Sequence, residues 1–385
     1  MLGQDGPLRI GVLGAGMITT VFYGFLPGLA KIPDRAVATA IASRTRSRAE
    51  AVAAAHDIGT VYDNLAGMLT HGGLDAVVNA TPAAEHFETS RQILRAGKHL
   101  VTDKPLAATV AQAQELTRIA DEAGALIVCA PFDMLAAEWR EARRLVVSGA
   151  LGKVAFGRVH SSHAGPAAMS WPTDPTWYYQ EGAGSLADIG IYGLTQVTGV
   201  LGPALRVCAL SGTTAPVRHA RGGPFAGLPI AVTADDNTLL MLDFGDSVFA
   251  VIDGTFTVAA SKAPQMEIYG LGGTLLVNDP RSGQPPGEVP IDLFRFDAAP
   301  GLDGWISPRT VGLPAAPDRT RELARAVLIE HLADCLRDGT PPVPSGEHAT
   351  HVLEIILAAQ RAARDGQTVG LTTTFSPADG GPLRA

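Results

Sequence analysis

A pair of glycines, one residue apart, joins a predicted strand to a predicted helix. The sequence reads Gly14-Ala15-Gly16 directly after the apolar run Leu8–Leu13, and Thr19 stands where a third glycine of the dinucleotide-binding fingerprint would be. The first glycine permits a tight turn, and the second lets the backbone approach a pyrophosphate. The position between a strand and a helix favours dinucleotide binding over a turn with only a structural role. We predict cofactor contacts in this turn from Gly14, Gly16, Met17 and Ile18.

The end of the second predicted strand carries hydroxyl and guanidinium groups in place of a carboxylate. Residues 42–48 read Ala-Ser-Arg-Thr-Arg-Ser-Arg. An NAD site usually has Asp or Glu here, which accepts a hydrogen bond from the ribose 2′-hydroxyl. Ser43, Arg44 and Arg48 instead suit a 2′-phosphate, because guanidinium groups bind phosphate oxygens bidentately. The pattern favours NADP, with NAD as the alternative cofactor; an exposed basic turn of a helix is the other interpretation.

Two further predicted strands end in polar residues. One leads into Asn79-Ala80-Thr81-Pro82, and the next along the chain leads into Thr102-Asp103-Lys104-Pro105. Open α/β sheets bind ligands at the carboxyl ends of their central strands. Lys104 stands out, because a lysine that leaves a buried strand needs either solvent or a chemical task. We predict further cofactor contacts from Ala80, Thr81, Pro82, His86, Asp103 and Lys104.

Aromatic residues gather between positions 171 and 192, which hold Trp171, Trp177, Tyr178, Tyr179 and Tyr192. Aromatic faces pack against the C–H faces of sugars, although an ordinary core cluster is the alternative. Asp188 and Tyr192 are four residues apart, so they share one face if this Gly-rich segment is helical. We predict substrate contacts from Lys104, His163, Trp177, Asp188 and Tyr192.

The elements that must position these residues begin with an alternating half. Between residues 8 and 130, short apolar runs alternate with helix-forming stretches, which predicts a doubly wound parallel sheet, the Rossmann arrangement of the α/β class. Pro27 should kink or shorten the first helix, expected at about Ile18–Lys31. The predicted strands are Leu8–Leu13, Val37–Ala42, Ala76–Ala80, His99–Thr102 and Leu126–Ala130. The other predicted helices are Arg46–His56, Glu85–Ala96 and Thr109–Ala123.

The remaining residues predict a second, α+β domain with a large, mostly antiparallel open sheet. Its predicted strands are Val154–His160, Arg206–Ser211, Thr238–Phe244, Val248–Thr257, Gln265–Leu271, Thr274–Val277 and Thr368–Thr372. Its predicted helices are Leu135–Ser148, Thr320–Asp338 and Ser345–Asp365, and Gly212–Thr233 and Asp279–Asp318 are expected to be long surface loops. The division predicted is a dinucleotide-binding domain over residues 1–130 and a substrate and oligomerisation domain over residues 131–385.

Composition excludes several other classes of protein. The 385 residues include 46% hydrophobic and 18% charged residues, typical of a globular protein with a sizeable core. The net charge of −8 argues against a nucleic-acid partner, and no apolar run approaches the roughly 18 residues of a membrane span. Three widely spaced cysteines predict neither disulfides nor a metal site. The first residues lack an export signal, so a cytoplasmic location is expected.

Three of these motifs, taken in order, resemble the glucose-fructose oxidoreductase/inositol dehydrogenase/rhizopine-catabolism (Gfo/Idh/MocA) family. They are Gly14-Ala15-Gly16, Asp103-Lys104-Pro105 and the run from Gly182 to Tyr192. The family usually has Glu-Lys-Pro and Gly-Gly-Gly, and many members carry His at the position of Tyr192. The motif Asp-Ile-Gly-Ile-Tyr at residues 188–192 is more similar to the glucose-fructose oxidoreductase and dihydrodiol dehydrogenase branch. The resemblance covers residues 8 to 371.

The resemblance implies an NAD(P)-dependent oxidoreductase that transfers a hydride to or from a secondary alcohol or ketone of a sugar, glycoside or polyol. Lys104, Asp188 and Tyr192 would be its catalytic residues, and its open sheet would form a homodimer or homotetramer. A hydroxyl that loses a hydride also needs a proton acceptor. A phenol has a pKa near 10, which a nearby lysine ammonium would lower. Whether Lys104 or Tyr192 holds the proton stays open.

Two other functions remain as alternatives. In one, a tightly bound cofactor oxidises the substrate transiently, and the net reaction is glycoside cleavage or epimerisation. In the other, the chain is a cofactor-binding regulator without turnover, although the joint presence of Lys104, Asp188 and Tyr192 argues against this.

Overall fold

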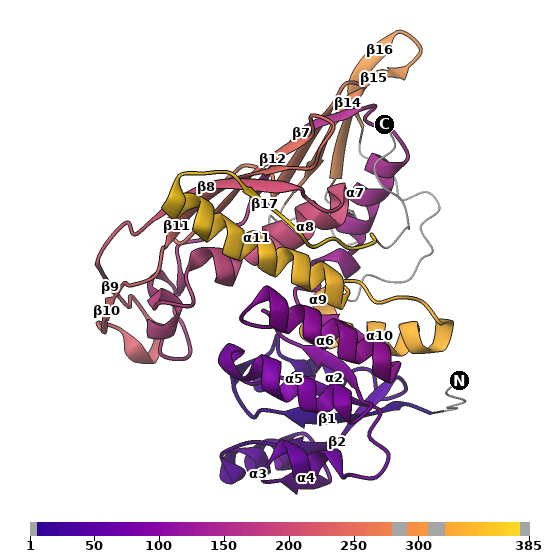
Figure 1. Ribbon diagram of the computed structural model, residues 1–385, viewed down its shortest axis with the longest axis vertical. Helices are drawn as coiled ribbons and strands as arrows, with labels where there is room; N and C mark the ends of the chain where they lie inside the picture. The colour runs from indigo at the N-terminus through magenta and orange to yellow at the C-terminus, as the bar shows by residue number, and fades with distance from the viewer. Residues whose placement is uncertain (1–5, 279–290, 307–319, 378–385) are drawn as a thin grey trace. The chain divides into compact units, whose positions relative to one another are not determined.

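Figure 1 shows the computed structural model, which describes residues 6–278, 291–306 and 320–377. The chain forms two compact units. The first comprises Met1–Ala136 and Pro317–Leu353, and the second comprises Ala137–Ala316 and Glu354–Ala385. The boundary predicted at residue 130 assigned all later residues to the second domain, whereas the described residues 320–353 fall in the first unit.

A six-stranded parallel sheet forms the centre of the first unit, in the order β3-β2-β1-β4-β5-β6. This order confirms the predicted doubly wound α/β sheet. Its strands are β1 (Leu8–Leu13), β2 (Ala36–Ala42), β3 (Thr60–Tyr62), β4 (Ala76–Asn79), β5 (His99–Thr102) and β6 (Ile127–Cys129). The short edge strand β3 was not predicted, because its three residues are only half buried and lack a continuous apolar run.

Helices cover both faces of this sheet. They include α3 (Arg46–Ala55), α4 (Leu65–Leu69), α5 (His86–Arg95) and α6 (Val110–Ala123). One face also receives α10 (Val327–Asp338), whose Leu328 and Leu332 are buried against Ile10 and Val12 of β1 in one apolar cluster. This packing over more than 300 residues of sequence places residues 320–338 in the first unit.

The first helix differs from the prediction. It is interrupted between α1 (Met17–Thr20) and α2 (Phe25–Leu29), because the chain turns at Gly24, where a Cβ atom would lie 2.5 Å from the carbonyl oxygen of Ile18. Pro27 neither kinks nor ends the helix. It lies in the first turn of α2, where its missing N–H has no partner to lose.

A nine-stranded, mostly antiparallel sheet dominates the second unit, in the order β16-β15-β14-β13-β7-β12-β11-β8-β17 (Figure 1). Among the strands that the structure describes in this sheet, β7 and β12 pair in parallel and the other neighbours pair antiparallel. Its central strands are β7 (Val154–His160), β12 (Phe249–Thr255), β11 (Asn237–Asp243), β8 (Arg206–Gly212), β13 (Met266–Gly270) and β14 (Gly273–Val277), with β17 (Val369–Gly370) at one edge. Helices α7 (Ala137–Val147) and α8 (Ile191–Leu201) pack together, and α8 contacts β7 and β12. The predicted α+β architecture is confirmed.

Two expected loops contain strands. Within Gly212–Thr233, β9 (Val217–His219) and β10 (Pro229–Ala231) form a separate antiparallel pair. Within Asp279–Asp318, β15 (Ile291–Ala299) and β16 (Leu302–Ile306) extend the large sheet, while residues 279–290 and 307–319 lie outside the described residues.

The late helices also differ in detail from the prediction. The helix predicted over Thr320–Asp338 is divided into α9 (Thr320–Leu323), a 3-10 turn and α10, with Ala324 at a φ of 47°. The last long helix, α11, spans Gly346–Asp365. No helix among the described residues is long and apolar enough to cross a membrane.

Candidate active site

The glycine turn after β1 has the geometry that a dinucleotide needs. Gly14 has a φ of 107°, and a Cβ there would lie 2.5 Å from the carbonyl oxygen of Ala80. At Gly16, by contrast, a Cβ would meet no protein atom within 4 Å. The protein itself therefore requires glycine at position 14 but not at position 16. A small residue at position 16 suits the close approach of a pyrophosphate, so the turn fits the predicted cofactor.

Thr19 explains why the third glycine can be absent. Its side chain is buried, and its hydroxyl donates to the carbonyl oxygen of Gly14 at 2.8 Å. The chain starts a new helix only at Phe25, so the fingerprint's usual close packing of a continuous helix is not needed at this position.

The basic residues after β2 differ in their contacts. Arg46 contacts Glu50 at 2.8 Å and Asp63 at 2.7 Å, which directs it along α3. Arg44 instead forms an ion pair of 2.7 Å with Glu85, a residue that the sequence analysis did not single out. Ser43 accepts a hydrogen bond from the backbone N–H of Thr45, and Arg48 is exposed. Arg44 and Arg48 are thus the exposed guanidinium groups that the NADP prediction requires.

A buried amide and a buried imidazole organise the loop after β4. The Oδ1 atom of Asn79 accepts from the hydroxyl of Thr81 at 2.7 Å, and its Nδ2 atom donates to Thr89 and Ser90. His86 is buried, with Nε2 2.9 Å from the carbonyl oxygen of Thr81. These contacts fix the loop Ala80–Pro82 beside Gly14.

His86 also reaches the loop after β5. Its Nδ1 atom lies 2.6 Å from the carbonyl oxygen of Pro105, the residue that follows Lys104. A carbonyl oxygen only accepts hydrogen bonds, so the neutral ring can satisfy one of its two contacts and the doubly protonated ring satisfies both. His86 therefore positions two loops, and its direct contact with the cofactor stays a prediction.

Asp103, on the other side of Lys104, is paired with a buried arginine. The Nε atom of Arg325 lies 3.3 Å from Oδ1 of Asp103, and its Nη1 atom donates to the carbonyl oxygen of Tyr23 at 3.4 Å. The guanidinium also lies 5.7 Å from the centroid of the Tyr23 ring. Arg325 was missed, although an arginine within an apolar helical run was a signal. The two residues that flank Lys104 are thus held by side-chain contacts, and Lys104 itself is partly exposed.

In the second unit, the Gly182-to-Tyr192 segment forms a wide helical turn of the π type, Leu186–Gly190, that runs into α8. The segment is helical, as the spacing of Asp188 and Tyr192 required. Every residue of α8 except Tyr192 is buried, and Asp188 is also partly exposed. Because π turns are rare and occur often at functional sites, this local geometry supports the assignment of a site.

Two buried serines fasten this turn, and neither was predicted. The hydroxyl of Ser185 donates to the carbonyl oxygen of Gly254 at 2.7 Å. The hydroxyl of Ser161 donates to the carbonyl oxygen of Ile189 at 2.6 Å and accepts from the N–H of Gly193 at 2.9 Å. Ser161 therefore holds the backbone on both sides of Gly190. Serines of this kind carry no signal in a single sequence.

The aromatic residues near this turn fall into two groups. Tyr178 and Tyr179 are buried in an apolar cluster, so they have the core role that was the alternative to sugar binding. Trp177 has 52% of its surface exposed and stacks at a tilt on Tyr178. His163 accepts a hydrogen bond from the N–H of Gly165 and stacks on Phe256. Trp177 and His163 remain the predicted substrate contacts of this group.

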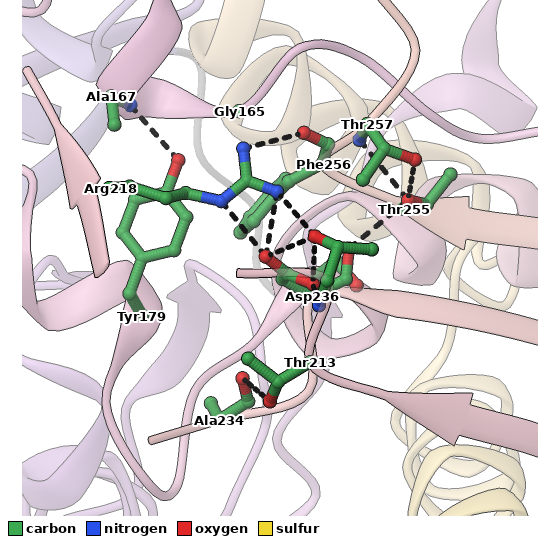
Figure 2. Close-up of polar contacts among 12 residues, drawn as sticks. Gly165, Ala167, Tyr179, Thr213, Arg218, Ala234, Asp236, Thr255, Phe256 and Thr257 are labelled. Carbon is green, nitrogen blue, oxygen red and sulfur yellow. Dashed lines mark hydrogen bonds and ion pairs between the residues drawn. The ribbon is translucent and has the colours of Figure 1, made fainter. Parts of the chain in front are cut away.

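Figure 2 shows a polar network that anchors the neighbouring hairpin. The buried carboxylate of Asp236 accepts from Nε of Arg218 at 2.9 Å and from the N–H of Thr214 at 2.8 Å. Arg218 lies over the ring of Tyr179, whose hydroxyl accepts from the N–H of Ala167. Burial raises the pKa of Tyr179, so its phenol stays protonated at neutral pH. The network is structural, and it holds the strand pair β9–β10 against Phe256.

Among the described residues, no group of three His, Cys, Asp or Glu side chains could hold a metal ion. Burial raises the pKa of the Cys129 thiol far above its usual range, which makes it an inert core residue.

Comparison with known proteins gives the same assignment for both units. Residues 8–130 match the family described as "Oxidoreductase family, NAD-binding Rossmann fold", and residues 139–276 match the "GFO/IDH/MocA C-terminal domain". Together these two matches cover most of the chain.

Individual relatives span nearly the whole length. The scyllo-inositol 2-dehydrogenase (NADP(+)) IolW of Bacillus subtilis is 25% identical, with 94% of this chain and 96% of the relative covered. The D-xylose 1-dehydrogenase [NADP(+)] of Haloarcula marismortui is 26% identical, with 95% and 94% covered. The structure of the WlbA dehydrogenase from Bordetella pertussis, in complex with NADH and UDP-GlcNAcA, has a TM-score of 0.72 at 21% identity and covers 96% of this chain and 99% of that one.

The glycine turn, the doubly wound sheet, the open second sheet and the matches over both units lead to one assignment. The chain belongs to the Gfo/Idh/MocA family, and it is an oxidoreductase with an NAD(P)-binding Rossmann domain.

Proposed function

We propose that the protein is a sugar or polyol oxidoreductase that favours NADP over NAD. The observation that carries the proposal is the position of Lys104 at the carboxyl end of β5, within the strand ends that surround the glycine turn. The sheet order reverses direction between β1 and β4, and ligands of doubly wound sheets bind at such a point. Two relatives of nearly full length are named as NADP(+) dehydrogenases of an inositol and of a sugar, which supports both the cofactor and the substrate class.

The residues proposed to hold the cofactor lie along one edge of the first sheet. Gly14, Gly16, Met17 and Ile18 would face the pyrophosphate, and Ser43, Arg44 and Arg48 would face the 2′-phosphate. Ala80, Thr81, Pro82, His86 and Asp103 would shape the remaining wall, with Lys104 at its end. When bound, the nicotinamide supplies the group that accepts or donates a hydride.

The proposed catalytic groups then have separate tasks. Lys104 or Tyr192 accepts the proton of the substrate hydroxyl during oxidation and returns it during reduction. Asp188 orients the substrate or the lysine. His163 and Trp177 add substrate contacts. Tyr192 is partly exposed although every other residue of α8 is buried, and Asp188 is partly exposed in the preceding π turn, which supports this division. The chain departs from many relatives at Tyr192, so the identity of the sugar is not transferred from them.

The open face of the second sheet supports a further part of the proposal, a homodimer or homotetramer. Large apolar side chains are exposed on the three adjacent strands β8, β11 and β12, and register pairs Leu239 with Leu210 and Met241 with Val251. The exposed members are Leu210, Leu239, Met241, Phe249 and Val251. A contiguous apolar patch of this kind marks an interaction surface, and a second copy would cover it with the same side chains.

A panel of sugars, glycosides and polyols tests the proposed activity directly. Each compound is mixed with NADP or NAD, and the absorbance of the reduced cofactor is followed over time. We expect turnover on some member of the panel, with a higher kcat/KM for NADP. Product release without net formation of reduced cofactor would instead establish transient oxidation. Binding of a sugar without any turnover, with Tyr192→Phe unchanged in that binding, would favour a regulator.

A further inference from the structure

An ion pair joins the two loops on either side of the glycine turn. Arg44 follows β2, Glu85 follows β4, and these strands are the two neighbours of β1 in the sheet. The Nη1 atom of Arg44 lies 2.7 Å from Oε1 of Glu85. The pair therefore joins the loops on either side of the carboxyl end of β1, which leads into Gly14 and Gly16. The Arg44 side chain is 78% exposed and that of Glu85 is 35% exposed, so a ligand can reach both.

The backbone of Glu85 is fixed in a way that presents its carboxylate to Arg44. Glu85 is the last residue of the 3-10 turn Ala83–Glu85. Its N–H donates to the carbonyl oxygen of Pro82 at 2.8 Å, and its own carbonyl oxygen accepts from the hydroxyl of Thr89 at 2.7 Å. The pairing is therefore built into the loop rather than made by a side chain on a freely moving segment.

The carboxylate of Glu85 thus lies next to the end of β2, where residues 42–48 include no Asp or Glu. A carboxylate near the adenosine ribose favours a 2′-hydroxyl and repels a 2′-phosphate. A guanidinium that binds Glu85 also has fewer N–H groups left for a bidentate phosphate contact. Arg46 is held by Glu50 and Asp63 on the other side, so it does not replace Arg44. The two effects act in the same direction, against NADP.

We propose that Glu85 sets the cofactor selectivity of this protein, because it competes with the 2′-phosphate of NADP for Arg44. The inference rests on the proposed function only in requiring that the protein binds NAD(P). The preference for NADP is weakened by Glu85, and the site retains a useful affinity for NAD. Exposed ion pairs shift an equilibrium by up to about fivefold, and the repulsion between carboxylate and phosphate adds to this. Removing the carboxylate should therefore tighten NADPH binding by about threefold to tenfold.

Calorimetric titration with NADPH and with NADH measures this without any substrate. For Glu85→Gln we expect the stated gain for NADPH and a change below about twofold for NADH. Glu50→Gln is the matched control, because it removes the same charge from another exposed ion pair, with Arg46. We expect it to leave both affinities unchanged. Glu85→Ala serves as a second variant, and thermal melts check that each protein is folded.

A double-mutant cycle decides whether the effect passes through Arg44. In an Arg44→Ala background, Glu85→Gln should lose most of its effect on NADPH. An unchanged or weaker NADPH affinity in Glu85→Gln would overturn the inference, as would a gain that persists without Arg44. If the parent protein bound neither cofactor, the proposed function itself would fail. A parent that binds both, with no response to Glu85→Gln, would refute only the selectivity role.

Discussion

Removing the Arg325 side chain should destabilise the first unit far more than removing a comparable surface arginine. Arg325 and Asp103 are each only 8% exposed, and Arg325 contacts both Asp103 and the carbonyl oxygen of Tyr23. Arg325→Met leaves the Asp103 carboxylate buried without this partner. Breaking a buried pair on one side costs about 3–5 kcal/mol. At about 2–4 °C per kcal/mol for a unit of this size, the melting temperature should fall by roughly 6–20 °C.

Arg337→Met is the matched control for this prediction. Arg337 lies in α10, downstream of the 3-10 turn that holds Arg325, with 55% of its side chain exposed, and it pairs with Asp334 and Asp338. Exposed pairs contribute up to about 1 kcal/mol, so its loss should be small. Chemical denaturation and thermal melts give both values. Adding Asp103→Asn to Arg325→Met should recover part of the stability, because the double variant no longer has the unpaired carboxylate of Asp103. Equal losses below about 1 kcal/mol for Arg325→Met and Arg337→Met would refute this reasoning.

Three further predictions concern other parts of the chain. Gly14→Ala should lower the free energy of unfolding by at least about 2 kcal/mol, because its Cβ would meet the Ala80 carbonyl oxygen and its φ is positive. Gly16→Ala should leave the denaturation curve unchanged and weaken NADPH binding. Met241→Lys should shift the protein toward monomers in light-scattering chromatography, while Leu271→Lys, at an exposed apolar residue outside the patch, should not; identical masses would contradict the interface. Burial lowers the pKa of His348 to about 3, and the nearby His351 contributes in the same direction. Between about pH 6.5 and 3 the unfolded chain therefore binds a proton that the folded chain does not, so the free energy of unfolding should decrease as pH falls through this range. Melts of His348→Asn should decline less over this range, and an equal decline would remove His348 as the cause.

The first sheet could be predicted from the sequence because its central strands are short runs rich in apolar residues that alternate with helix-forming stretches. Leu8–Leu13 and His99–Thr102 were predicted with the bounds that the structure has. The edge strand β3 was not predicted, since Thr60–Tyr62 is half buried and too short to show the apolar pattern of a strand. The break in the first helix was placed at Pro27, but the close backbone contact at Gly24 decides it. That contact depends on a turn that the residue types alone do not reveal.

The candidate site shows the same division. Gly14, Lys104 and Tyr192 carry local signals, namely a glycine after a strand, a lysine that leaves one and a phenol at helical spacing from a carboxylate. Glu85 and Arg325 act through partners that are 41 and 222 residues away in sequence. Such pairings follow from the sheet order and from the return of residues 320–353 to the first unit, which no local pattern encodes.

The most direct test of the central claim compares turnover and NADPH affinity in Lys104→Met and Lys98→Met. Both lysines flank β5, but Lys98 precedes its amino end and Lys104 follows its carboxyl end. We expect Lys104→Met to lower kcat by about 10²-fold or more with NADPH affinity nearly unchanged, since a proton-transfer group contributes to rate rather than to cofactor binding. Lys98→Met should retain parental values of both. If Lys104→Met kept more than about a third of the parental kcat, Lys104 would be an ordinary surface lysine and the proposed active site would be wrong.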